Sequence, residues 1–342
     1  MSSSRKADEQ AIVAAGDALT GTGYFTHVYV EAGRQDATAP SFVWSHLPNG
    51  EDVFDLASMT KALVTVPLVG ATKIHGKTTL SELALLAPTR PIDLPHDVGQ
   101  LSVSSVLNHS SGLPAWTNFW INRLNDTVTA NELRATAHDH IATVMRRRSQ
   151  WLAGEGADRY SDIGFIILGA LYERMIGEGI EHAFTRLAGA PSGKSWLGYL
   201  PPPEIMSRTI SCGTCAVRGR ELKGEVHDEN CAALGGVTGH AGLFGTGAGV
   251  RQWLQRFWNS DGGASFRGAG CLGWRKADDP SSRGFGHGHA IGHMGFTGTA
   301  FWLIPSDGRY GIVLTNRVIS GRVSEAIKIF RAETFSRLDR LA

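Results

Sequence analysis

The chain has 342 residues, of which 42% are hydrophobic and 19% charged, as is ordinary for a globular protein with one large domain or two closely joined subdomains. Its 33 lysines and arginines nearly balance 32 aspartates and glutamates, so no net field favours nucleic acid or an anionic membrane as a partner. No segment approaches the roughly 20 apolar residues of a membrane span.

The N-terminal segment is polar, and the apolar run at residues 11–15 is too short for the core of a signal peptide. We therefore expect a cytoplasmic protein, or a periplasmic one if a leader has been lost. Residues 8–19 carry apolar side chains at helical spacing and predict a helix. Residues 25–30 and 41–44 have the pattern of strands, and a third short run, residues 53–57, follows them.

Ser58 and Lys61 form an S-x-x-K sequence at the expected start of a helix, because residues 62–66 are mostly apolar. Residues i and i+3 of a helix share a face, so this spacing puts an ammonium beside a hydroxyl. A lysine whose pKa is lowered by its surroundings can take the serine proton, and a helix N-terminus favours the developing alkoxide. Ser58 is the candidate nucleophile and Lys61 the candidate base, although S-x-x-K also occurs by chance in surface helices.

The middle of the chain predicts short helices, among them one within residues 103–114 that ends in a glycine and proline stop, and a long amphipathic helix over residues 129–148. Tyr160 precedes an apolar helix that Ser161 or Asp162 can cap. Such a tyrosine usually packs against its neighbours. Beside a Ser–Lys pair it is also a candidate proton shuttle, because nearby cations stabilise its phenolate.

Residues 191–225 have little periodicity, so we expect a long irregular crossing there. The last quarter returns to strands and a closing helix, expected over residues 283–289, 293–304, 310–315 and 324–338. Strands at both ends with helices between them predict an α/β fold. Residues 1–75 and 246–342 would build the sheet and its terminal helices, and residues 76–245 would form an inserted, mainly helical subdomain.

Cysteine and histidine patterns offer a rival, metal-binding interpretation. The four cysteines are Cys212, Cys215, Cys231 and Cys271. One C-x-x-C without a second pair favours reduced structural thiols over a zinc site. The H-x-H-x-x-x-H of His287, His289 and His293 could ligate a metal if the strands and turn allow it. The remaining histidines are not expected to do chemistry. His109 and His227 are expected to brace loops through hydrogen bonds, and His240 is expected to lie at the border of the cleft.

Several segments, in this order, resemble the motifs of the penicillin-recognising serine hydrolases, most closely the class C β-lactamase branch with its D-amino-acid peptidases and esterases. The three main ones are Ser58-Met59-Thr60-Lys61, Tyr160-Ser161-Asp162 and His293-Met294-Gly295. Residues 107–114, 227–230 and 239–244 also look like this branch, so the resemblance covers about residues 54–316. It implies the family's sandwich, an antiparallel sheet flanked by helices with an all-helical insertion, and implies neither a metal nor a cofactor.

By that resemblance Ser58 attacks a carbonyl carbon and is acylated, Lys61 and Tyr160 share the proton, and water releases the acyl group. The backbone N–H groups of Ser58 and Phe296 would hold the oxyanion, and loss of one such donor typically costs about 10²–10³ in rate. His293 would orient the substrate or lie on the oxyanion side.

Two residues depart from the family pattern. Asp162 stands where the lactamase branch commonly has asparagine, and His293 stands where the third motif usually begins with lysine. A fixed charge that would bind a substrate carboxylate is thus replaced by a group that is largely neutral at pH 7, so we do not expect efficient hydrolysis of penicillins. Asp162 and Gly295 are expected to contact the substrate.

The sequence therefore predicts a serine hydrolase that acts through an acyl-enzyme on a small amide or ester. A peptide ending in D-amino acids, as in peptidoglycan fragments, is expected ahead of a carboxylic ester. One alternative is a penicillin-recognising binding or sensor protein with negligible turnover, which would show burst labelling by β-lactams without steady hydrolysis. The other is a metal-dependent hydrolase, which insensitivity to chelators would eliminate.

Overall fold

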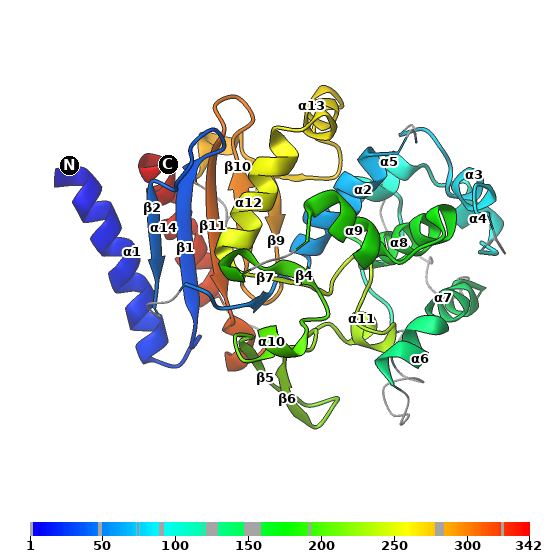
Figure 1. The fold of residues 1–342 in the computed structure, drawn as a ribbon, viewed down its shortest axis with the longest axis horizontal. Coiled ribbons are helices and arrows are strands. Elements are labelled where there is room, and N and C mark those ends of the chain that lie inside the picture. Colours follow the sequence, from blue (N-terminus) through cyan, green and yellow to red (C-terminus); the bar gives the residue numbers. More distant parts are fainter. Residues whose placement is uncertain are drawn as a thin grey trace.

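The computed structural model describes residues 3–46, 50–72, 74, 76–88, 92–118, 120, 129–146, 159–190, 193–277, 284–322 and 325–342 (Figure 1). Its main sheet is antiparallel, with the order β2-β1-β11-β10-β9-β8. The strands are β1 Val28–Arg34, β2 Phe42–Ser45, β8 Arg275–Lys276, β9 Ile291–Met294, β10 Ala300–Leu303 and β11 Arg309–Thr315.

The two ends of the chain meet in this sheet, because β1 pairs with β11 along its whole length. Helices α1 (Ser3–Gly21) and α14 (Ala326–Leu341) lie together on one side of the sheet, and α12 (Gly247–Trp258) lies on the other (Figure 1). Apolar side chains of both terminal helices, such as Ile12 and Phe335, are buried with those of the strands. The predicted sheet built from both termini is therefore present.

A helical layer extends from the α12 side of the sheet (Figure 1). Its central helix, α8 (Asp162–Ile176), is buried on all sides from Ile163 to Tyr172, as expected for a helix that is apolar all round. The other described helices are η1 Lys61–Thr65, α2 Val66–Gly70, α3 Leu80–Leu85, α4 His96–Gly99, α5 Val103–Leu107, α6 Ala130–Ala135, α7 Ala137–Arg146, α9 Ile180–Ala188, η3 Gly193–Ser195, α10 Pro203–Met206, α11 Glu229–Ala233, α13 Asp261–Gly268, η4 Gly286–Gly288 and η5 Arg317–Ser320.

Two small sheets complete the fold. One has the order β3-β7-β4, and the other is the pair β5-β6. Their strands are β3 Phe54–Asp55, β4 Leu197–Tyr199, β5 Ser211–Cys215, β6 Arg220–Lys223 and β7 Leu243–Gly245. Strands β4 to β7 lie within residues 76–245, so that segment contains more than helices, and its boundaries as a subdomain stay a prediction. None of the described helices is both long and apolar enough to cross a bilayer.

Several predicted elements were wrong. The helix expected over residues 129–148 is two helices that break at Thr136, whose hydroxyl bonds to backbone carbonyls of the preceding turn; residues 147 and 148 lie outside the described part. The strand expected over residues 283–289 is instead the turn η4, where His287 has a positive φ of 47°, and residue 283 is not described. The expected strand 293–304 is β9, a tight turn and β10.

Candidate active site

Ser58 follows β3 in a tight turn. Three successive i→i+3 hydrogen bonds, the last from Lys61 N to Ser58 O, close this turn before the helical segment η1 begins. In such 3₁₀ geometry the side chains at i and i+3 are eclipsed. The Lys61 Nζ accordingly lies 2.8 Å from the Ser58 Oγ. The pairing expected from the S-x-x-K spacing is therefore present.

A buried carboxylate supports this turn, and sequence reasoning missed it. Ala57 has a φ of +47°, which is rare for a residue with a Cβ, and its N–H donates to Asp55 Oδ1 at 2.8 Å. The other carboxylate oxygen accepts from the backbone N–H of His227 at 2.7 Å. Burial raises the Asp55 pKa to about 6, although these two N–H groups and nearby Arg218 oppose the shift. Asp55 thus ties the turn at Ser58 to the segment at His227.

Lys61 is fully buried, and its ammonium contacts Ser58 Oγ, Asp162 Oδ1 at 2.7 Å and His240 O at 3.3 Å. Burial alone would lower its pKa, but the attraction of Asp162 and of Tyr160 outweighs burial and the pKa is raised. The expectation of a lysine with a lowered pKa is therefore wrong for this state. The main cause is the Asp162 carboxylate, 2.7 Å from the ammonium.

Tyr160 lies at the entrance of α8, as predicted, and Ser161 caps that helix through Gly164 N at 3.1 Å. The Lys61 Nζ lies 5.0 Å from the centre of the Tyr160 ring. Burial raises the Tyr160 pKa despite the opposing charge of Lys61 and hydrogen bonds with Lys61 and Ser58. The phenol is therefore protonated at neutral pH, and the structure gives no support to a resting phenolate.

Two neutral histidines flank Tyr160. His109 accepts the Ser161 N–H at 3.0 Å through Nδ1, which confirms its predicted role in bracing a loop, and its ring lies 4.4 Å from that of Tyr160. His293, on β9, is 1% exposed and its Nδ1 donates to Met294 O at 2.8 Å. Burial and the charge of Lys61 lower the His293 pKa well below its ordinary value. His293 therefore carries no fixed charge, and its side chain does not line the described cavity.

The two amides expected to hold an oxyanion are both at the cavity. Neither Ser58 N nor Phe296 N donates to a hydrogen bond within the described part of the chain. A Cβ on Gly295 would lie 2.6 Å from Leu56 O, so only glycine lets this strand end approach the turn at Ser58. The carbonyl of Phe296 accepts two hydrogen bonds from Arg317, at 2.9 and 2.6 Å, which fix the turn.

A cavity of about 530 Å³ opens over Ser58. Its described lining combines acidic and basic side chains on different elements, with the aromatic rings of Trp116 and Phe296. The charged residues are Asp162, Asp228, Arg317, Arg322, Glu325, Lys328 and Arg331. A cavity of this size, lined by Ser58 with Lys61 buried beside it and with two available amides, is suited to acyl transfer.

Comparison with known proteins decides the family. The profile described as Beta-lactamase matches residues 11–334. The chain belongs to the beta-lactamase family.

Named relatives of this beta-lactamase family member are distant. A provisionally named D-alanyl-D-alanine carboxypeptidase of Escherichia coli K12 is 23% identical over 304 residues, or 78% of this chain and 69% of the relative. The N-acetylmuramyl-L-alanine amidase of Bacillus subtilis 168 is 26% identical over 307 residues, or 78% and 68%. A class C beta lactamase structure from Rhodobacter sphaeroides gives a TM-score of 0.62 at 13% identity, covering 95% of this chain and 98% of that one. The predicted β-lactamase-like fold is confirmed.

The residues of the rival metal hypothesis are separated in this member of the beta-lactamase family. His287 is 88% exposed at η4 and His289 is also exposed, whereas His293 is buried. None of the four cysteines forms a disulfide. No group of three or more His, Cys, Asp or Glu side chains within the described ranges is arranged to hold a metal ion.

Proposed function

We propose that this protein is a serine hydrolase that forms an acyl-enzyme at Ser58. The Ser58 Oγ would bond to the substrate carbonyl carbon, the bond to the leaving nitrogen or oxygen would break, and water would then release the acyl group. The observation that carries the proposal is the 2.8 Å contact between Ser58 Oγ and Lys61 Nζ beside two amides that have no acceptor in the described structure. Such amides are placed to stabilise an oxyanion.

The proton path is expected to include Asp162. Lys61 is protonated at rest, so it can accept the Ser58 proton only if it gives one of its own protons to a neighbour. Asp162, at 2.7 Å, is the carboxylate within reach. In this scheme Lys61 takes the Ser58 proton and passes one of its own to Asp162 as the acyl bond forms. Lys61 and Tyr160 then deliver a proton to the leaving group, and Asp162 gives its proton back to Lys61.

The proposed substrate is a small peptide containing D-amino acids, of the kind found in peptidoglycan fragments. The names of the carboxypeptidase and amidase relatives support this choice, as does a cavity large enough for a short peptide. A carboxylic ester is the second candidate. The buried, uncharged His293 favours it, since the lysine that would bind a substrate carboxylate is absent.

The test is to measure release of terminal D-alanine from N-acyl-L-lysyl-D-alanyl-D-alanine, and of p-nitrophenol from p-nitrophenyl acetate. We expect Ser58→Ala to abolish every reaction that the wild type catalyses. Ser110→Ala is the matched control, because Ser110 is exposed on a loop, and it should keep them. Release of D-alanine supports the peptide substrate, and hydrolysis of the acetate alone supports the esterase. Turnover that survives in Ser58→Ala would overturn the proposal.

A further inference from the structure

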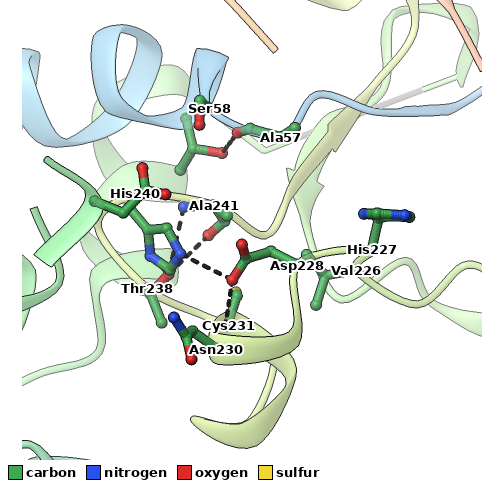
Figure 2. Close-up of polar contacts among 12 residues, drawn as sticks. Ala57, Ser58, Val226, His227, Asp228, Asn230, Cys231, Thr238, His240 and Ala241 are labelled. Carbon is green, nitrogen blue, oxygen red and sulfur yellow. Dashed lines mark hydrogen bonds and ion pairs between the residues drawn. The ribbon is translucent and has the colours of Figure 1, made fainter. Parts of the chain in front are cut away.

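A carboxylate–histidine pair, Asp228 and the buried His240, lies at the wall of the cavity, beside the nucleophile but outside the Ser–Lys–Tyr group (Figure 2). His240 Nε2 lies 3.0 Å from Asp228 Oδ1, and His240 Nδ1 lies 2.7 Å from Thr238 Oγ1. The same Asp228 oxygen accepts the Cys231 N–H at 2.7 Å, at the start of α11. The sequence contained both segments, but nothing in it paired residues 228 and 240.

The Asp228 carboxylate is ionised. Burial would raise its pKa, but His240, the Cys231 N–H and the charge of Lys61 together lower it. A carboxylate only accepts hydrogen bonds when ionised, so His240 Nε2 must carry the hydrogen in this contact. His240 itself is 1% exposed and is thereby fixed in orientation.

Only one oxygen of Asp228 is used in these contacts. Both hydrogen bonds go to Oδ1, and within the described residues no hydrogen bond reaches Oδ2. Figure 2 shows this second oxygen directed toward the side on which Ala57 and Ser58 lie. The side chain keeps 24% of its surface exposed, and it lines the cavity together with Ser58 and Ala241. One ionised oxygen therefore faces the space where a substrate acylating Ser58 would lie.

The surrounding contacts hold this carboxylate at a fixed place relative to the nucleophile. The adjacent residue, His227, is tied by its backbone N–H to Asp55, which also holds the turn before Ser58. From the other side, His240 O lies 3.3 Å from the Lys61 ammonium. Such a rigid, partly desolvated anion attracts a cation by a charge-assisted hydrogen bond and repels a substrate carboxylate.

We propose that Asp228 is a specificity-determining residue whose Oδ2 binds a primary ammonium group near the scissile carbonyl of the substrate. This inference rests on the proposed function, because it requires a substrate at Ser58. Other cations of the cavity have their own partners: Arg322 lies 2.5 Å from Glu229 and Lys328 lies 2.9 Å from Glu325. Within the described residues His240 and the Cys231 N–H bond to Oδ1 of Asp228, so its second oxygen is left for a ligand.

The test compares two substrates of nearly equal size, D-alanine methyl ester and methyl isobutyrate, which carries a methyl group in place of the ammonium. For the wild type we expect kcat/KM to be about ten- to hundredfold higher for the amino ester, the range of a hydrogen bond to a charged group. In Asp228→Asn this selectivity ratio should fall by the same factor. Asparagine is as good an N-cap as aspartate, so α11 should keep its start.

The ratio separates recognition from a purely structural role, because a displaced nucleophile would slow both esters alike. Asp36→Asn is the control. It also removes one carboxylate, but from an exposed ion pair with Arg34, and it should leave the ratio unchanged. A wild type that does not prefer the amino ester, or an Asp228→Asn ratio equal to that of the wild type, would overturn the inference. Labelling of Ser58 by a fluorophosphonate distinguishes the two failures: with labelling, the inference alone fails, and without labelling or turnover the proposed function fails as well.

Discussion

Replacing Asp162 by asparagine removes the carboxylate that lies 2.7 Å from the buried Lys61 ammonium. At that separation two unit charges attract by about 6 kcal/mol at an effective dielectric constant of about 20. The loss of hydration by both groups opposes this attraction. Removing one partner of a buried pair is therefore expected to cost about 3–5 kcal/mol in the free energy of unfolding.

The pH dependence of this loss of stability tests whether Lys61 is the group that causes it. In the wild type its folded pKa lies above the ordinary 10.5, so its stabilisation is fully present at neutral pH and is lost only as the pH rises through the folded pKa. In Asp162→Asn burial dominates and lowers the folded pKa, so the unfolded chain binds more protons. The stability of the variant should therefore rise between pH 6 and pH 9, and its deficit against the wild type should shrink.

Urea unfolding at pH 6.0, 7.5 and 9.0 measures this deficit. Asp8→Asn is the matched control, because it also breaks an ion pair, with Arg340 at 2.6 Å, but an arginine keeps its proton throughout this range. Its deficit should be constant. The acid limb of the pH profile of kcat/KM in Asp162→Asn should also move to lower pH, because Lys61 loses its proton at lower pH in the variant. A deficit for Asp162→Asn that is the same at pH 6 and pH 9 would refute the assignment of this charge to Lys61.

Three further outcomes are expected. The Asp55 pKa is raised from 3.8 to about 6 in the folded protein, so the stability that Asp55 contributes is fully present below pH 3.8 and is lost as the pH rises through 6. In urea unfolding, the free energy of unfolding of the wild type should therefore fall by on the order of 3 kcal/mol between pH 4 and pH 7, and Asp55→Asn should lack this fall. Gly295→Ala should cost about 1–3 kcal/mol by overpacking and should slow acylation, whereas Gly21→Ala, with open space around it, should cost less, and equal urea midpoints would contradict this. Arg317→Lys replaces the guanidinium that donates two hydrogen bonds to the Phe296 carbonyl and so loosens the turn that places the Phe296 N–H. The kcat should therefore fall by up to about 10² in steady-state assays, and an unchanged kcat would exclude a role for this turn.

The parts of the site that the sequence predicted follow from short-range rules. Ser58 and Lys61 are three residues apart in one turn, and Ser161 caps the helix that Tyr160 precedes, so each feature needs only local geometry. The fold class was also predictable, because strands at both ends of the chain and helices between them imply a sheet that joins the termini. The catalytic roles of these residues stay predictions.

The rest depends on contacts that no local pattern encodes. Asp55 accepts a hydrogen bond from the backbone of His227, which is 172 residues away in the sequence. The pairing of Asp228 with His240 likewise depends on how the segments on either side of α11 pack together. The charge of Lys61 was mispredicted because it is set by the distance to Asp162, which comes from a different helix. The strand expected over residues 283–289 failed because alternation of residue types could not reveal the positive φ of His287.

The most direct test of the account is the intact mass of the protein after incubation with a fluorophosphonate and, separately, with a fluorescent penicillin, for the wild type and Ser58→Ala. The account predicts one fluorophosphonate adduct on the wild type, located on the peptide that contains Ser58, and none on the variant. A penicillin adduct at the same residue would favour peptidoglycan-type substrates over simple esters. An adduct that persists in Ser58→Ala, or no adduct with either reagent on folded wild-type protein, would contradict Ser58 as the nucleophile.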